Sequence, residues 1–255
     1  MFHTKNHTAT LQKLLHRSLR MIVMLCLATI VTVAQAQQAP PTPSATTAVG
    51  TSKIWGNVDG MAIEGLVQGP SAADAQLQVA CVFEYTEGDI FNPPALPAPL
   101  NGMVHLDHAL NGLITDIRKS GKFSGHALET ILITPPAGTL KAKKLLLIGL
   151  GDRSKFNTDL MIQVGSVALR EALNIGVTHF AFASDIKDAG IDSPTALVAG
   201  NVTKGIIAAY RTQAFLKSKK MAAYKPVTKV TLLAGPSFFT TAGEGIKEAI
   251  ASYHN

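Results

Sequence analysis

The sequence predicts a three-layer α/β/α domain with a mixed sheet whose C-terminal strands are largely parallel. From Lys144 onward, strand-like and helix-like segments alternate three times along the chain. The strands are continuous apolar runs, such as KLLLIGL at 144–150, which are typical of strands buried on both faces. The helical segments repeat apolar residues every three or four positions, so each offers one face to the sheet.

The first half of the domain is predicted to add two strands and one long helix. A short strand is expected over 61–69, and LQVACVFEY at 77–85 is apolar enough for a buried strand. A loop with prolines at 93, 94, 97 and 99 follows, because proline removes the backbone donor that regular structure needs. Apolar residues at helical spacing predict a single helix over 104–120, which Gly121 ends.

The second half supplies the remaining elements in alternation. We expect strands over 128–134, 144–150, 178–184 and 227–234, and helices over 158–174, 193–217 and 241–253. Asn157 or Thr158 is placed to cap the first of these helices, and Gly176 lies just past its end. Ser193-Pro194 is a start signal for the second helix, because proline suits the first helical position.

Residues 1–36 are predicted to be a secretory signal, followed by a linker over 37–51 and the folded domain over 52–255. Four basic residues precede an apolar run over 21–33, and Ala34-Gln35-Ala36 suits cleavage before Gln37. The apolar run is short for a bilayer span, so an uncleaved membrane anchor is the weaker alternative. The linker is uncharged and rich in Pro, Ala and Thr. The expected location is therefore periplasmic or secreted, with no membrane span after cleavage.

Composition argues against a nucleic-acid partner and against a disulfide framework. The formal net charge of +6 includes the four basic residues of the leader, so the rest of the chain is close to neutral. Lys217, Lys219 and Lys220 form a small basic cluster at a helix end, where they complement the helix dipole. Cys81 is the single cysteine beyond the leader, and its apolar neighbours predict a small buried hydrophobe.

Four stretches resemble the leucyl aminopeptidase family, over roughly residues 61–255. They are ADAQLQVACVFE at 73–84, HLDHALNG to FSG over 105–125, ETILITP with LKAKKLLLIGLG over 129–151, and GIIAAYR at 205–211. They look like the early strand, the first long helix, the strand pair ending in Gly-Leu-Gly and the closing helix of that family's N-terminal domain. The resemblance implies a macro-domain-like α/β/α unit that packs in an oligomer.

The resemblance carries no catalytic residue over to this chain. In the family, two metal ions and the catalytic residues lie in the C-terminal domain, whose Asn-Thr-Asp-Ala-Glu-Gly-Arg run is not found in this sequence. A dinuclear hydrolase needs several convergent carboxylates to hold its metals and activate water. We therefore expect no enzyme and no cofactor, but an exported, non-catalytic binding or assembly module with a protein partner or a second copy.

Two other functions stay open at this point. A small-ligand binder would use the macro-like crevice for a nucleotide or an ADP-ribose-like molecule. A metal-dependent aminopeptidase, acting alone or as half of a split enzyme, would release N-terminal residues from peptides.

The candidate ligand-binding residues are Gly149, Gly151 and Asp152. The run Gly149-Leu150-Gly151-Asp152 lies between a strand and a helix, where macro-like and Rossmann-like folds hold phosphates on backbone N–H groups. It lacks the third glycine of the dinucleotide fingerprint. A tight turn that needs a positive φ is the stronger explanation of the two glycines.

No metal site and no catalytic serine are predicted. His105 and His108 lie three apart at the start of a helix, but no third ligand follows at a suitable spacing, and His126 falls in a loop. A solvent-exposed first helical turn explains the two histidines better. Ser124-Gly125-His126 also lies in a loop, outside any Gly-x-Ser-x-Gly elbow.

Overall fold

A seven-stranded mixed sheet organises residues 46–253, the part of the chain that this computed structural model describes. The predicted secretory signal and most of the predicted linker lie outside the described residues. Between residues 46 and 253, no helix has the length and apolar character needed to cross a membrane.

The strands follow the order β1-β2-β7-β6-β3-β5-β4 across the sheet. The five central strands are parallel, and the edge strands β1 and β4 are antiparallel to their neighbours, which confirms the predicted mixed sheet. The bounds are β1 Ser52–Val58, β2 Met61–Val67, β3 Leu77–Val82, β4 Thr130–Ile133, β5 Leu145–Gly149, β6 His179–Ala183 and β7 Lys229–Ala234.

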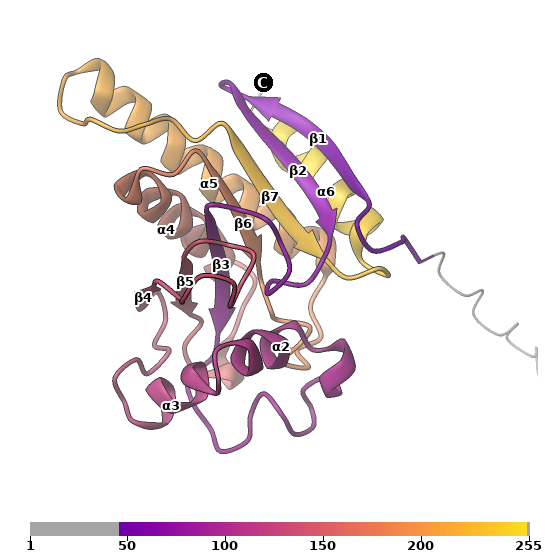
Figure 1. The fold of residues 1–255 in the computed structure, drawn as a ribbon. Helices are drawn as coiled ribbons and strands as arrows, with labels where there is room; N and C mark the ends of the chain where they lie inside the picture. Colours follow the sequence, from indigo (N-terminus) through magenta and orange to yellow (C-terminus); the bar gives the residue numbers. More distant parts are fainter. Residues whose placement is uncertain (1–45, 254–255) are drawn as a thin grey trace, which may run out of the picture. The chain divides into compact units, whose positions relative to one another are not determined.

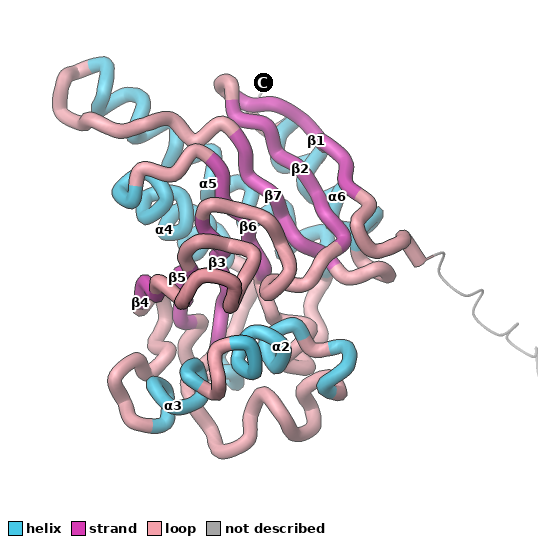
Figure 2. The backbone as a smooth tube through the Cα atoms, in the orientation of Figure 1, coloured by secondary structure: helices cyan, strands magenta, loops and turns pink. Residues whose placement is uncertain are grey.

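Helices cover both faces of the sheet, which confirms the three-layer α/β/α class (Figures 1 and 2). The helices α4 (Leu160–Ile175), α5 (Thr195–Ser218) and α6 (Phe239–Ala251) pack side by side on one face. The shorter helices α2 (Gly102–Ala109) and α3 (Leu113–Lys119) cover β3 and β5 on the other face. Two short 3-10 turns complete the described helices, η1 (Ala98–Leu100) and η2 (Arg153–Lys155).

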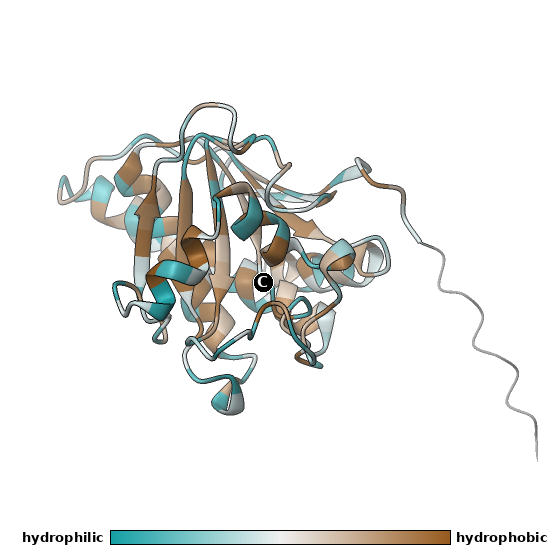
Figure 3. Ribbon diagram, turned by 60° about the horizontal axis from the view of Figure 1, so that its bottom comes forward, coloured by the Kyte–Doolittle hydropathy of each residue, from teal (hydrophilic) through white to brown (hydrophobic). Residues whose placement is uncertain are grey.

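Side-chain alternation along the central strands separates two hydrophobic cores. In β3, Val79 faces the core under α4, α5 and α6, and Ala80 faces the core under α2 and α3. Leu146 and Leu147 of β5 divide in the same way. Because the central strands are buried on both faces, they carry apolar residues at nearly every position (Figure 3).

The single helix predicted over 104–120 is wrong, because the chain forms two helices there. Asn111 and Gly112 take left-handed φ values of 56° and 82°, which end α2. The buried Asp107 carboxylate then accepts hydrogen bonds from the Thr115 N–H at 3.1 Å and hydroxyl at 2.8 Å, in the first turn of α3. The apolar spacing continues across the break because both helices face the same core.

Other differences lie at the element ends. The edge strand β1 was not expected, since most of its residues are exposed and give no apolar run; a tight Asp59-Gly60 turn with positive φ values joins it to β2. The predicted Ser193 cap is wrong, because α5 begins at Thr195 after Pro194 without a side-chain cap. Asn157 does accept the Asp159 and Leu160 N–H groups at the start of α4.

Candidate functional site

The C-terminal ends of β3, β5 and β6 meet where the connections of the sheet change face. After β3 the chain runs to α2 on one face, whereas after β5 and β6 it runs to α4 and α5 on the other. Open α/β folds bind ligands in the crevice outside the strand ends at such a switch point. The crevice here is lined by Cys81, Val82, Phe83, Asp89, Ile90, Asn101, Met103, Arg153, Asp185, Asp188 and Ala189.

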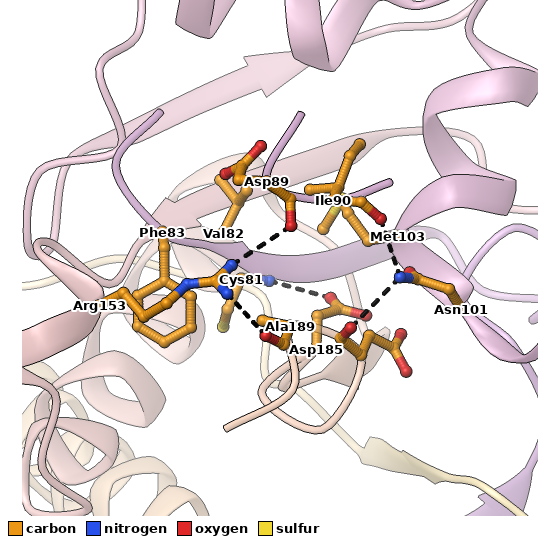
Figure 4. A pocket seen from close by; sticks show the side chains of 11 residues that line it. Cys81, Val82, Phe83, Asp89, Ile90, Asn101, Met103, Arg153, Asp185 and Ala189 are labelled. Carbon is orange, nitrogen blue, oxygen red and sulfur yellow. Dashed lines mark hydrogen bonds between the residues drawn. The ribbon is translucent and has the colours of Figure 1, made fainter. Parts of the chain in front are cut away.

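The crevice is filled by the chain's own side chains and encloses only about 10 Å³, at the lower limit for one water molecule. Arg153 lies across it (Figure 4), donating to the Ala189 carbonyl at 2.8 Å and to the Asp89 carbonyl at 3.4 Å. Its guanidinium also lies over the Phe83 ring, 5.6 Å from the centroid. An open hollow of about 270 Å³, lined by residues 86–89, 92–94 and Arg153, adjoins the crevice.

Asn101 ties together the loops that form the opposite wall. Its buried side-chain amide donates to the carbonyl oxygens of Ile90 at 3.1 Å, Leu96 at 3.2 Å and Asp188 at 3.2 Å. Its side-chain oxygen accepts from the Val104 N–H and so caps α2. One residue therefore starts the helix and holds the loops after β3 and β6 against each other.

Two carboxyl groups from the loop after β6 face the end of β3 and the start of α2. Asp185 accepts the Cys81 N–H at 3.2 Å, and Asp188 accepts the Gly102 N–H at 2.8 Å. Burial and the neighbouring Asp188 raise the pKa of Asp185 well above its usual value, and burial also raises the pKa of Asp188, so this pair of carboxyl groups favours holding a proton. Burial raises the pKa of the Cys81 thiol well above its usual value, so the thiol stays neutral.

A buried ion pair holds Asp89, one of the residues that line the crevice. Arg118 of α3 and Asp89 have almost no exposed side-chain surface, and their closest atoms are 2.6 Å apart. The Arg118 guanidinium also donates to the Phe83 carbonyl at 3.2 Å. The pair fastens the α2–α3 layer to the end of β3.

The three candidate ligand-binding residues of the Gly-Leu-Gly-Asp run use their donors and acceptors internally. The N–H of Gly149 donates to the Glu129 carbonyl at 2.8 Å, and the N–H of Gly151 donates to the Gly125 carbonyl at 2.9 Å. Gly151 has a φ of 76°, as the tight-turn interpretation requires. Asp152 accepts the N–H and hydroxyl of Ser154. Ligand binding at this turn stays a prediction. A ligand that used these backbone N–H groups or the Asp152 carboxylate would have to displace the internal hydrogen bonds.

The structure does not bring the histidines together. His105 and His108 are exposed on α2, and the His108 ring stacks on Phe91 at 5.9 Å between centroids. His126 instead bonds to the Glu84 carboxylate at 2.7 Å, which raises the pKa of its imidazole. Within residues 46–253, no three His, Cys, Asp or Glu side chains are arranged to hold a metal ion.

Sequence reasoning missed the residues that build the crevice. Asn101, Arg153 and the Asp185–Asp188 loop are three segments that are far apart in the sequence, so no spacing pattern joins them. A signal was present at Asp185, a charged residue just after a buried strand, where open α/β folds place ligand sites.

Comparisons with known proteins agree on the family and the fold. Residues 86–220 match the N-terminal domain of the cytosol aminopeptidase family. A probable cytosol aminopeptidase of Roseiflexus castenholzii is 32% identical over 141 residues, which is 55% of this chain and 28% of the relative. A second, from Geotalea uraniireducens, is 31% identical over 96 residues, 37% of this chain and 19% of the relative. The chain thus matches less than a third of the length of these relatives.

Two solved structures share the fold at low sequence identity. A tomato leucine aminopeptidase mutant aligns with a TM-score of 0.52 and 20% identity, over 84% of this chain and 38% of that one. An Oceanobacillus iheyensis macrodomain with MES bound aligns with a TM-score of 0.51 and 16% identity, over 79% of this chain and 98% of that one. Together with the match over residues 86–220, these similarities show that the chain belongs to the cytosol aminopeptidase family, through the macro-like N-terminal domain of that family.

Proposed function

We propose that this chain is an exported, non-catalytic binding or assembly module built on the aminopeptidase N-terminal domain. The observation that carries the proposal is the crevice, because the place where this fold would hold a small molecule is closed by internal hydrogen bonds. A site for substrate needs free donors and acceptors around an open space. Here the donors of Arg153 and Asn101 and the acceptor of Asp188 are used in hydrogen bonds between the loops of the crevice.

The surface that we assign to protein contact is the face of β1 and β2 opposite α6, which we call the open face. In the described part of the chain α6 covers one side of these strands, and no helix is drawn over the other side (Figure 1). Ile54 on β1 is 54% exposed there, and Glu64 and Leu66 of β2 lie on the same side. A sheet face without a covering layer offers room for a partner chain or a second copy.

Export is part of the proposal and rests on the residues of the leader. The basic residues before the apolar run and the small residues at Ala34 and Ala36 support cleavage before Gln37. The curated relatives are called cytosol aminopeptidases, so export would set this chain apart from them. Intact-protein mass spectrometry that gives the mass of a chain starting at Gln37 would support export with cleavage, and a mass that includes the leader would contradict it.

A second candidate function is small-ligand binding at the crevice. The observation that favours it is the open hollow beside Arg153, since movement of that one side chain would join the hollow to the crevice. An Oceanobacillus iheyensis macrodomain of the same fold was solved with ADP, at a TM-score of 0.51 and 16% identity. An ADP-ribose-like molecule is therefore the ligand to test.

One preparation, residues 37–255, separates these functions. We expect no release from leucine or alanine chromogenic amides above a metal-only blank, with manganese or zinc added and a full-length family enzyme as positive control. We also expect no saturable heat on titration with ADP-ribose, because the crevice has no space for it. Hydrolysis above the blank would overturn the non-catalytic proposal, and saturable binding would favour the second candidate.

A further inference from the structure

A basic projection extends from the body of the molecule at the end of α5. It comprises residues 212–226, the last turns of α5 and the loop that follows, and is the orange segment at the upper left of Figure 1. We call this segment the tip. Two large apolar side chains are exposed on it, Phe215 at 61% and Met221 at 77%. Met221 has the most exposed surface of the large hydrophobic side chains in the described part of the chain.

The charge of the tip is entirely positive. It carries Lys217, Lys219, Lys220 and Lys225, all of them exposed, and no Asp or Glu occurs anywhere between Asp192 and Glu244. None of the four lysines forms an ion pair with another residue between 46 and 253. An unscreened positive cluster of this kind attracts an anionic surface.

Internal contacts give the tip a defined shape. The Tyr224 ring packs edge-on against Tyr210 with centroids 6.5 Å apart, and Lys217 donates to the Tyr224 carbonyl at 3.3 Å. The Met221 N–H donates to the Leu216 carbonyl at 2.9 Å and so closes the end of the helix. These contacts anchor the loop to the helix and leave Met221 exposed, while the Lys219 ammonium lies over the exposed Phe215 ring, 5.5 Å from its centroid.

The combination of lysines and apolar side chains matches the boundary layer of a lipid bilayer. Lysine ammonium groups pair with lipid phosphates, while their methylene stems and the neighbouring apolar groups enter the acyl region. An acidic protein would match the lysines alone. A nucleic acid would match the lysines and the Phe215 ring, on which a base can stack, but would leave the apolar Met221 side chain in water. We propose that the tip docks this protein on the surface of anionic lipid bilayers.

Vesicle binding tests the proposal. The described residues form one compact unit with its own cores, so residues 37–255 are used, without the apolar leader that would bind lipid by itself. We expect sedimentation with phosphatidylcholine vesicles that contain phosphatidylglycerol, little with phosphatidylcholine alone, and weaker binding as salt rises. The variant Lys219→Gln/Lys220→Gln/Lys225→Gln should lose about fivefold in binding for each lysine.

Matched controls distinguish binding through the tip from an effect of net charge and from non-specific hydrophobic adsorption. Lys122→Gln/Lys141→Gln/Lys143→Gln removes the same charge from exposed positions elsewhere and should bind like the wild type. Phe215→Ser/Met221→Ser should weaken binding without changing the charge, and Leu100→Ser/Leu197→Ser, at other exposed leucines, should not. Each variant is first checked for a cooperative unfolding transition.

Three results would overturn the proposal. The first is no binding to either vesicle, the second is equal loss in the two lysine variants, and the third is wild-type binding in the Phe215→Ser/Met221→Ser variant. Binding to DNA or heparin without binding to vesicles would also overturn it and would assign the tip to another polyanion.

Discussion

Asp185 is a lining residue of the crevice whose pKa is raised well above its usual value by burial and by a neighbouring carboxyl group, that of Asp188. An ionised Asp185 would place two negative charges side by side in a region that water reaches poorly, which is costly. Protonation solves this problem and also provides the hydrogen bond to Asp188. Asp185 adopts a left-handed φ of 52°, which asparagine also tolerates.

Replacing Asp185 by asparagine should remove a pH dependence of stability and keep the hydrogen bonds. The carboxamide can accept the Cys81 N–H and donate to Asp188, as the protonated acid does. Because the pKa is raised in the folded state, the folded protein binds a proton that the unfolded chain loses above about pH 3.9. The wild-type free energy of unfolding should therefore fall as the pH rises from there to the raised pKa, by at most about 1.4 kcal/mol per pH unit.

The difference between wild type and variant isolates this effect. Urea unfolding across the pH range should show the fall in the wild type and in Asp192→Asn, whose carboxyl is fully exposed, and a flatter curve in Asp185→Asn. Parallel curves for all three proteins would mean that Asp185 is ionised in the folded state.

At the scale of elements, the sequence predicted the strands and helices that an apolar run or a helical apolar spacing marks. The central strands and α4, α5 and α6 are found near their predicted places, because their burial repeats in the sequence. The break between α2 and α3 was missed, because an unbroken apolar spacing outweighed the Asn111-Gly112 pair that signals a turn. The edge strand β1 was missed because an exposed strand has no apolar run.

Gly112→Ala tests the physical cause of the break. A methyl group at Gly112 would meet no atom within 4 Å, so its cost comes from the left-handed φ of 82° alone. We expect a loss of roughly 1–2 kcal/mol in the free energy of unfolding. Gly69→Ala is the matched control, because Gly69 is equally open and has no positive φ, and it should be neutral or slightly stabilising. Equal effects would show that backbone conformation does not hold the break.

At the scale of the whole molecule, two cores lie on opposite faces of one sheet, and the crevice lies where their loops meet. The sequence predicted the layers, because alternating strands and helices determine them. It could not predict the closure of the crevice, which depends on hydrogen bonds between residues as distant as Asn101 and Asp188, or Arg153 and Asp89. The smaller core under α2 and α3 is joined to the end of β3 by the Arg118–Asp89 pair.

We expect this smaller layer to open before the rest of the domain. Amide hydrogen exchange should be faster in α2 and α3 than in α4 and α5, because short helices over a small core open at a lower free energy. Arg118→Ala leaves Asp89 buried without its partner and should cost about 3–5 kcal/mol, with the gain in exchange concentrated in α2, α3 and the loop before them.

The exposed Arg211–Asp59 pair, with 40% and 42% of the side chains accessible, provides the matched control on the other side of the sheet. Arg211→Ala should cost less than about 1 kcal/mol and leave exchange in α2 and α3 unchanged. If Arg118→Ala instead accelerated exchange equally in α2, α3, α4 and α5, the two cores would unfold as one cooperative unit. The closed crevice would then open only with the whole domain, and ligand entry by movement of the α2–α3 layer would be excluded as well.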